Sequence, residues 1–261
     1  MTQTDLYLDR QGCVAHLVLN RPDKRNALSA AMWSALPALL AEAEADTRIR
    51  TLIVRGMGGH FASGADIGEF ETVYATPESS DTYSRAIGAG LNALADFAKP
   101  SIAQIEGVCV GGGCGLALAC DMRFAAPGAR FAITPAKLGL VYPFRDTKRL
   151  IDCVGLAVAK DMLFSARALD SEEALQTGLI NRIVPATDLA AEVAAYCDHM
   201  ATLSPYSARQ TKAMMAAIES GITEETPEVE ALYLDAFAAP DFKEGFAAFL
   251  AKRKPVFPGH D

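Results

Sequence analysis

A glycine-rich segment has the residue types that most clearly suggest chemistry. It runs Val110-Gly-Gly-Gly-Cys-Gly-Leu-Ala-Leu-Ala-Cys-Asp121, between an expected strand at 101–105 and an expected helix of small residues. Glycine lets the backbone approach a ligand closely because it carries no Cβ. A helix that begins there points unpaired N–H groups and its positive dipole end at whatever binds. The segment therefore predicts a site for an anion, or for an oxygen that becomes one, although a tight strand-to-helix turn would also explain it.

A second loop of small residues favours the functional interpretation. Phe61-Ala-Ser-Gly-Ala-Asp66 follows another apolar strand, expected at 51–55. Ala65 and Gly112 lie 47 residues apart, a spacing close to one βαβ repeat. Two backbone amides directed at one oxygen form an oxyanion hole. We therefore expect the amides of Ala65 and Gly112 to donate to the same oxygen.

Composition and charge narrow the class of protein. The 261 residues are 51% hydrophobic and 21% charged, which is enough for a sizeable core. A net charge of −8 argues against nonspecific nucleic-acid binding, but it permits a local basic pocket for a phosphorylated ligand. We expect no membrane-spanning helix, because no apolar run approaches 18 residues, and no export signal in the first residues.

The six cysteines predict neither a disulfide framework nor a metal site. They form no Cys-x-x-Cys pair, and the four histidines are too scattered for a zinc set. We interpret them as small core residues of a cytoplasmic protein. A serine hydrolase using Ser63 with His60 or His199 is disfavoured, since the nucleophile-elbow motif is absent.

The pattern of elements indicates an α/β protein with a parallel-type sheet. Expected strands cover 14–19, 51–55, 101–105, 122–125 and 130–133, with helices at 29–45, 83–97 and 112–120 between them. The second half is mostly helical, with segments at 147–152, 156–164, 171–176, 189–203, 206–219, 224–236 and 242–252, and one short strand at 179–184. We expect one core with an appended helical subdomain.

Several motifs, in order along the chain, resemble the crotonase superfamily, the enoyl-CoA hydratase/isomerase family. They are Leu19-Asn-Arg-Pro-Asp-Lys-Arg-Asn-Ala-Leu28, Phe61-Ala-Ser-Gly-Ala-Asp-Ile67, and the segments 107–121, 138–140, 174–184 and 246–257. The resemblance implies a spiral of ββα units over residues 1–195. It also implies a helical subdomain over 196–261 that mediates trimerisation, often to a dimer of trimers.

The resemblance also implies a ligand and its contacts. The substrate would be an acyl-CoA whose thioester carbonyl binds the amides of Ala65 and Gly112, and CoA would be part of the substrate, with no separate cofactor and no metal. The implied CoA contacts are Lys24, Arg25, Ala27, Ser63, Ala65, Asp66 and Ile67, together with a tail from Lys252 to Phe257 that reaches the CoA site of a neighbouring subunit. Lys24 and Arg25 are also sensible partners for phosphates on chemical grounds.

The sequence departs from the hydratases of this family at both of their glutamate positions. Gly115 and Ala136 stand there, and neither can activate water or protonate Cα. Decarboxylation and double-bond isomerisation are therefore favoured over hydration. An unconventional hydratase and an acyl-CoA-binding relative without catalysis remain the alternatives.

Three residues at positions 142–146 suggest how the chemistry could proceed. Tyr142 is similar to a tyrosine of the methylmalonyl-CoA decarboxylase branch, where losing CO₂ would create the enolate without a base. Asp146 could be a single proton carrier for isomerisation, and Arg145 could hold a substrate carboxylate. Both could instead form salt bridges with neighbours such as Lys148. Glu69 and Glu71 are further candidate acids.

Overall fold

A computed structural model of the chain describes residues 4–257. Its main sheet has six strands in the order β1-β2-β3-β4-β6-β8, and a second sheet pairs β5 with β7. The strands are β1 (Leu6–Gln11), β2 (Val14–Leu19), β3 (Thr51–Gly56), β4 (Ser101–Ile105), β5 (Val108–Val110), β6 (Met122–Ala125), β7 (Arg130–Ala132) and β8 (Arg182–Ile183). Every pairing is parallel except that of β1 with β2. Each connection between two parallel strands therefore places the end of a strand and the start of the following helix at the same edge of the sheet.

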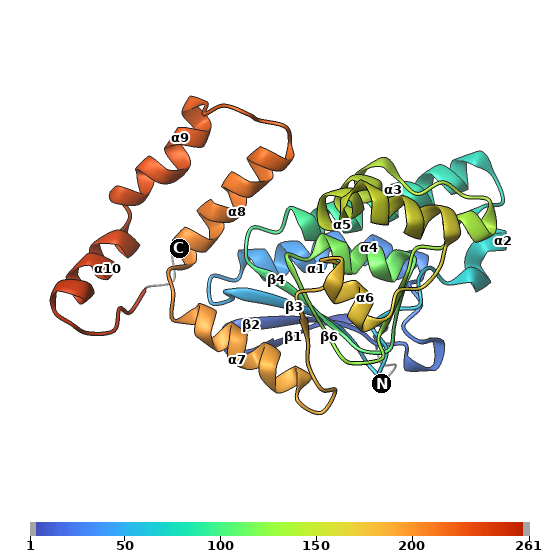
Figure 1. Ribbon diagram of the computed structural model, residues 1–261, viewed down its shortest axis with the longest axis horizontal. Helices are drawn as coiled ribbons and strands as arrows, with labels where there is room; N and C mark the ends of the chain where they lie inside the picture. Colours follow the sequence, from blue (N-terminus) through green and yellow to red (C-terminus); the bar gives the residue numbers. More distant parts are fainter. Residues whose placement is uncertain (1–3, 258–261) are drawn as a thin grey trace.

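Helices cover both faces of the main sheet, and a helical arm projects from it (Figure 1). The helices on one side are α1 (Ala30–Ala45), α2 (Phe70–Val73), α3 (Pro77–Ala95), α4 (Gly112–Ala119), α5 (Phe144–Ser165) and α6 (Ser171–Gln176). The opposite face is covered by α7 (Leu189–Ala201). The arm consists of α8 (Pro205–Glu219), α9 (Pro227–Leu234) and α10 (Pro240–Leu250). None of the helices among the described residues is long and apolar enough to cross a membrane.

The local sequence explains why the helices begin where they do. Ser29 caps α1 by accepting a hydrogen bond from the Met32 amide, and Trp33 and Leu36 on the same helix are fully buried. α3 begins six residues earlier than the sequence predicts, because Thr76 forms a capping box with Ser79 ahead of it. The part of α3 that lines the cavity, residues 84–92, lies within the predicted range.

The predicted strands 14–19, 101–105 and 122–125 are confirmed, whereas β1 and β5 were missed. Two predicted helices, 147–152 and 156–164, are one element, α5, with a kink at Gly155 (φ 76°). α5 begins at Phe144, so Asp146 lies in its first turn rather than in a loop.

The arm exposes large apolar side chains, among them Phe237, Phe246 and Phe249. The predicted division at 195/196 falls inside α7, whose Val193 and Cys197 pack against the sheet, and the chain leaves the sheet only after this helix. The division into two domains stays a prediction.

Candidate active site

The two glycine-bearing loops meet at the start of α4. A methyl group on Gly112 would lie 3.8 Å from the Ala65 nitrogen, and one on Gly64 would lie 3.7 Å from the Gly112 nitrogen. Within residues 4–257 neither the Ala65 nor the Gly112 amide donates a hydrogen bond. Gly112 is the first residue of α4, where amides have no partner inside the helix. The structure thus brings the two predicted donors together and leaves both free.

Main-chain hydrogen bonds fix the positions of both loops. The amides of Leu28 and Asp66 bond to Gly64 O and Leu28 O at 2.8 and 2.9 Å, on either side of Ala65. Val110 N donates to Ala62 O at 2.9 Å, which joins the two loops. Gly111 has φ 54°, a backbone conformation that favours glycine. The donors are therefore preorganised by backbone contacts, as an oxyanion hole requires.

The predicted CoA-binding loop packs against the first glycine-bearing loop. Ser63 N donates to Arg25 O at 2.9 Å, and Ser63 Oγ donates to Lys24 O at 3.1 Å. Lys24 Nζ and an Arg21 guanidinium nitrogen lie 2.9 and 2.8 Å from one Asp66 oxygen and lower the pKa of Asp66 to about 2. The Asp66 carboxylate thus holds the loop in place, whereas the Lys24 ammonium is half exposed to solvent.

Of the remaining predicted CoA-binding residues, some lie near the glycine-bearing loops and others lie far from them along the chain's tail. Ala27 is buried beside this loop, and Ile67 is 67% exposed at the cavity. Lys252 and Phe257 lie in the segment that returns along the arm toward α7 and α8, away from α2 and α3 (Figure 1). Phe257 O accepts a hydrogen bond from Arg50 at 2.7 Å. The chain's own tail therefore does not reach the cavity.

A cavity of about 540 Å³ opens beside the two amides. Both glycine-bearing loops, one face of α3 and the segment 134–146 form its walls. The residues that line these walls include Ser84, Gly88, Leu91, Asn92, Gly115, Leu138, Val141, Tyr142, Phe144, Arg145 and Asp146. Most of the lining is apolar, as is usual for a small-molecule site.

Tyr142 presents its hydroxyl to the position of the missing glutamate. A methyl group on Gly115 would lie 3.4 Å from Tyr142 Oη. The hydroxyl is buried and has no hydrogen-bond partner among residues 4–257. Burial raises the pKa of Tyr142 well above its usual 10, so the group is a neutral donor at physiological pH. An unpaired buried donor of this kind favours a ligand that accepts a hydrogen bond.

Asp146 places a carboxyl group in the cavity. Its side chain is 8% exposed, and Arg149 Nη1 lies 2.8 Å from Oδ1, while Arg149 Nη2 donates to Asn92 Oδ1 at 2.8 Å. Burial raises the pKa of Asp146, and Arg149 only partly opposes this. Asp146 does form a salt bridge with a neighbour, as the structural alternative expects, but the partner is Arg149, and Lys148 pairs with Asp152 instead. Asp146 is therefore a buried carboxyl group held in place by the Arg149 guanidinium.

The other candidate acids have different roles. Glu69 Oε2 accepts a hydrogen bond from the Ala30 amide at 2.7 Å and so stabilises the start of α1. Glu71 is exposed, and neither residue is among those that line the cavity in the described part of the chain. Arg145 does line it, with an exposed side chain.

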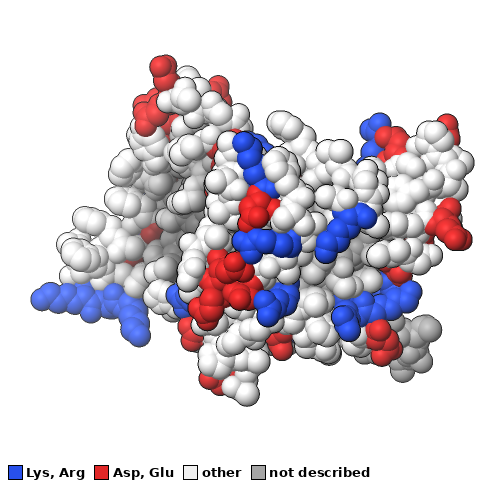
Figure 2. All heavy atoms as spheres, turned by 45° about the vertical axis from the view of Figure 1, so that its right-hand side comes forward, with Lys and Arg blue, Asp and Glu red and all other residues white. Residues whose placement is uncertain are grey.

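The hydrolase and metal alternatives gain no support. Ser63 Oγ donates to Lys24 O, whereas His60 Nδ1 accepts from Val108 N at 3.3 Å, so the two are not paired with each other. Over residues 4–257, no three His, Cys, Asp or Glu side chains gather as a metal site would need. Acidic and basic side chains are interspersed over the face shown in Figure 2.

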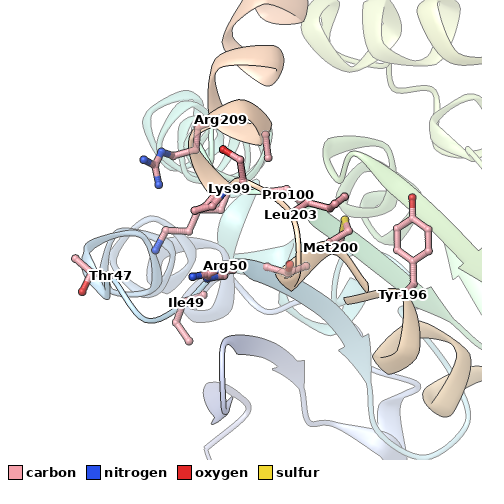
Figure 3. Close-up of a pocket in the computed structure, with 13 residues that line it drawn as sticks. Thr47, Ile49, Arg50, Lys99, Pro100, Tyr196, Met200, Leu203 and Arg209 are labelled. Atoms are coloured by element: carbon pink, nitrogen blue, oxygen red, sulfur yellow. The ribbon is translucent and has the colours of Figure 1, made fainter. Parts of the chain in front are cut away.

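A second hollow, of about 280 Å³, lies between the starts of β3 and β4 and the α7–α8 connection (Figure 3). Arg50, Lys99 and Arg209 line it. Lys99 Nζ donates to Ala43 O and Asp46 O, and Arg50 donates to Ala201 O and Phe257 O. These two cations hold chain segments together.

The largely parallel sheet, with two unpaired amides where its glycine-bearing loops meet, is the arrangement expected of a crotonase-type α/β protein. A sequence profile of the enoyl-CoA hydratase/isomerase family matches residues 9–260. The 2,3-dehydroadipyl-CoA hydratase of Escherichia coli K12 is 35% identical and covers 98% of this chain and 99% of its own length. The chain belongs to the enoyl-CoA hydratase/isomerase family.

Solved structures of other family members agree with this assignment. A family protein from Hyphomonas neptunium is 44% identical with a TM-score of 0.96, covering 98% of both chains. An enoyl-CoA hydratase/carnithine racemase from Magnetospirillum magneticum is 35% identical with a TM-score of 0.94, covering 99% of this chain and 97% of its own. The predicted crotonase fold is confirmed. Nothing in these matches distinguishes the methylmalonyl-CoA decarboxylase branch.

Proposed function

We propose that the protein binds an acyl-CoA and isomerises a double bond in its acyl chain, with Asp146 as the proton carrier. The thioester carbonyl lies between the amides of Ala65 and Gly112. The observation that carries the proposal is that Asp146 is the only carboxylic acid among the described residues that line the cavity. A 1,3-proton shift needs one group that accepts a proton and returns it, whereas the family's hydratases use two carboxylates.

The proposed reaction has two steps. Asp146 carboxylate removes a proton from Cα of a 3-enoyl thioester, and the electron pair moves onto the carbonyl oxygen. The two amides stabilise that charge, and each such donor is worth on the order of 10²–10³ in rate. As the enolate collapses, Asp146 returns the proton to Cγ and the double bond becomes conjugated. A raised pKa suits Asp146 to this role, because the stronger base removes a proton more readily.

A second candidate reaction is decarboxylation of a malonyl-type thioester. Loss of CO₂ leaves the electron pair on Cα and the carbonyl oxygen, so no base is needed. The observation that favours it is the unpaired hydroxyl of Tyr142, which could donate to the departing carboxylate or protonate Cα. Arg145, which also lines the cavity, supplies a cation for the carboxylate.

Rates on three thioesters separate these reactions. The protein is assayed with a 3-enoyl-CoA, methylmalonyl-CoA and crotonyl-CoA, and the first is expected to react fastest. Asp146→Asn should lower isomerisation by about 10²–10⁴-fold, the usual contribution of a general acid–base. Asp152→Asn, on the same helix in an exposed ion pair, is the matched control and should leave the rate unchanged. Full activity of Asp146→Asn, or faster hydration than isomerisation, would refute the proposal, and binding without turnover of any thioester would indicate a non-catalytic relative.

We further propose that the chain assembles as a homotrimer or a dimer of trimers. Lys252 and Phe257 are not among the described residues that line the cavity, and Phe257 O bonds to Arg50, so we propose that they contact CoA at the site of another copy. Exposed apolar side chains on α10 also need a covering surface. Light scattering on the protein as it elutes from a size-exclusion column measures its molar mass. The mass of a monomer would contradict this part of the proposal.

A further inference from the structure

One face of α3 forms a wall of the cavity. Ser84, Ile87, Gly88, Leu91 and Asn92 line the cavity from this helix. Their spacing of three and four residues places them on a single helical face. The two smallest, Ser84 and Gly88, are one turn apart, so this face is recessed between its larger side chains.

Nothing in the packing of the described residues requires a glycine at position 88. A methyl group on Gly88 would have no heavy atom within 4 Å, and the residue is not among those with positive φ. Gly90, on the same helix, is different: a methyl group there would lie 2.9 Å from Leu36 Cδ1, so the contact between α1 and α3 excludes one. Glycine in the interior of a helix is unfavourable relative to alanine. Gly88 therefore leaves space empty at some cost to the helix.

Large apolar side chains on the segment 134–146 also line the cavity and are exposed. Leu138 is 53% exposed, Val141 92% and Phe144 84%, and all three line the same cavity. Such exposure in a concave site favours an apolar ligand, because a ligand would remove this surface from water. The charged lining residues are Arg145 and Asp146.

We propose that Gly88, with Ser84, determines acyl specificity, and that the substrate carries an apolar acyl group longer than four carbons or comparably bulky. This rests on the proposed function, in that the cavity beside the Ala65 and Gly112 amides is the acyl site. The space left by Gly88 receives the distal part of the acyl chain, and the apolar side chains of the segment 134–146 contact it.

Binding of saturated acyl-CoAs tests the proposal separately from catalysis, since these thioesters have no double bond to move. Calorimetry compares free CoA, butyryl-CoA and octanoyl-CoA on the full chain. The unmodified protein is expected to bind octanoyl-CoA at least about tenfold more tightly than butyryl-CoA, because added methylenes are buried. Gly88→Leu should abolish this preference while butyryl-CoA affinity changes less than about threefold.

Two variants control for damage to the helix. Ala89→Leu places the same side chain at the next, exposed position and should keep the octanoyl preference. Gly88→Ala should give an intermediate preference and a melting temperature no lower than that of the unmodified protein. An unmodified protein without a preference for the longer chain, or Gly88→Leu that keeps it, would overturn the acyl-specificity proposal alone. Failure of every CoA thioester to bind would overturn the proposed function with it.

Discussion

The two sides of the cavity are built from different parts of the chain. One side, which we call the amide wall, consists of residues 63–65 and 111–112, and backbone hydrogen bonds hold its donors. The other, the acid wall, is the segment 134–146, whose chemistry depends on the side chains of Tyr142 and Asp146. A backbone N–H donor is kept by most amino-acid substitutions, whereas a side-chain acid is lost by a single substitution. Under the proposed mechanism, enolate stabilisation can therefore persist while the reaction that forms the enolate changes.

After the loss of the Asp146 carboxylate, the largest expected effect comes from removing one donor of the amide wall. Ala65→Pro deletes the N–H, and no described hydrogen bond depends on it. We expect kcat to fall by about 10²–10³-fold, because one fewer donor stabilises the enolate. Steady-state kinetics measures this, with the melting temperature and affinity for free CoA as checks on the fold. Unchanged kcat in a folded variant would remove the functional distinction between the two walls.

The acid wall predicts a pH dependence. Asp146 must be ionised to accept the Cα proton, and burial raises its pKa above the usual 3.8. We expect kcat to fall by about tenfold per pH unit below this raised pKa and to level off above it. The profile of kcat against pH measures the midpoint. A midpoint at or below 3.8, or the same acid limb in Asp146→Asn, would mean that another group carries the proton.

Introducing the two glutamates that the family's hydratases carry tests whether the acid wall alone limits hydration. A methyl group on Gly115 meets only ordinary contacts of 3.4 Å or more, and Ala136 is exposed, so neither position excludes a Cβ atom. The double variant Gly115→Glu with Ala136→Glu is expected to hydrate crotonyl-CoA at least about tenfold faster than the unmodified protein. The corresponding double glutamine variant is the control. Equal rates for the two would show that the absent carboxylates do not limit hydration.

The smallest effect is on the stability of the loop that supports the amide wall. Asp66 has a pKa of about 2 in the folded chain against 3.8 ordinarily, so its stabilisation is present above pH 4 and is lost as pH falls toward 2. Asp66→Asn should therefore lower the free energy of unfolding by about 1 kcal/mol at pH 7, allowing for solvent screening, and by much less near pH 2. Urea unfolding at both values measures this. Asp23→Asn, an exposed change in the same loop, should have no effect, and a loss that is equal at both pH values would contradict the ion-pair explanation.

The amide wall could be predicted from sequence because its residues carry a local signature. Glycines at positions 64 and 111–112 mark close backbone approach, and their strands are short apolar runs. For the acid wall, the sequence predicted only a set of candidate residues. Whether Asp146 is buried and paired with Arg149 depends on where α5 begins. The positions of Gly88 and Asn92 in the cavity lining were missed. Their helical spacing was visible, but nothing local shows which face of α3 borders a cavity. The cytoplasmic location stays a prediction.

A crystal structure with an unreactive acyl-CoA analogue tests the central claim most directly. We predict that the thioester carbonyl oxygen lies about 2.7–3.1 Å from both the Ala65 and Gly112 nitrogens, and that an Asp146 oxygen lies within hydrogen-bond reach of Cα. A carbonyl oxygen bound elsewhere in the cavity, with the two amides facing solvent, would contradict it.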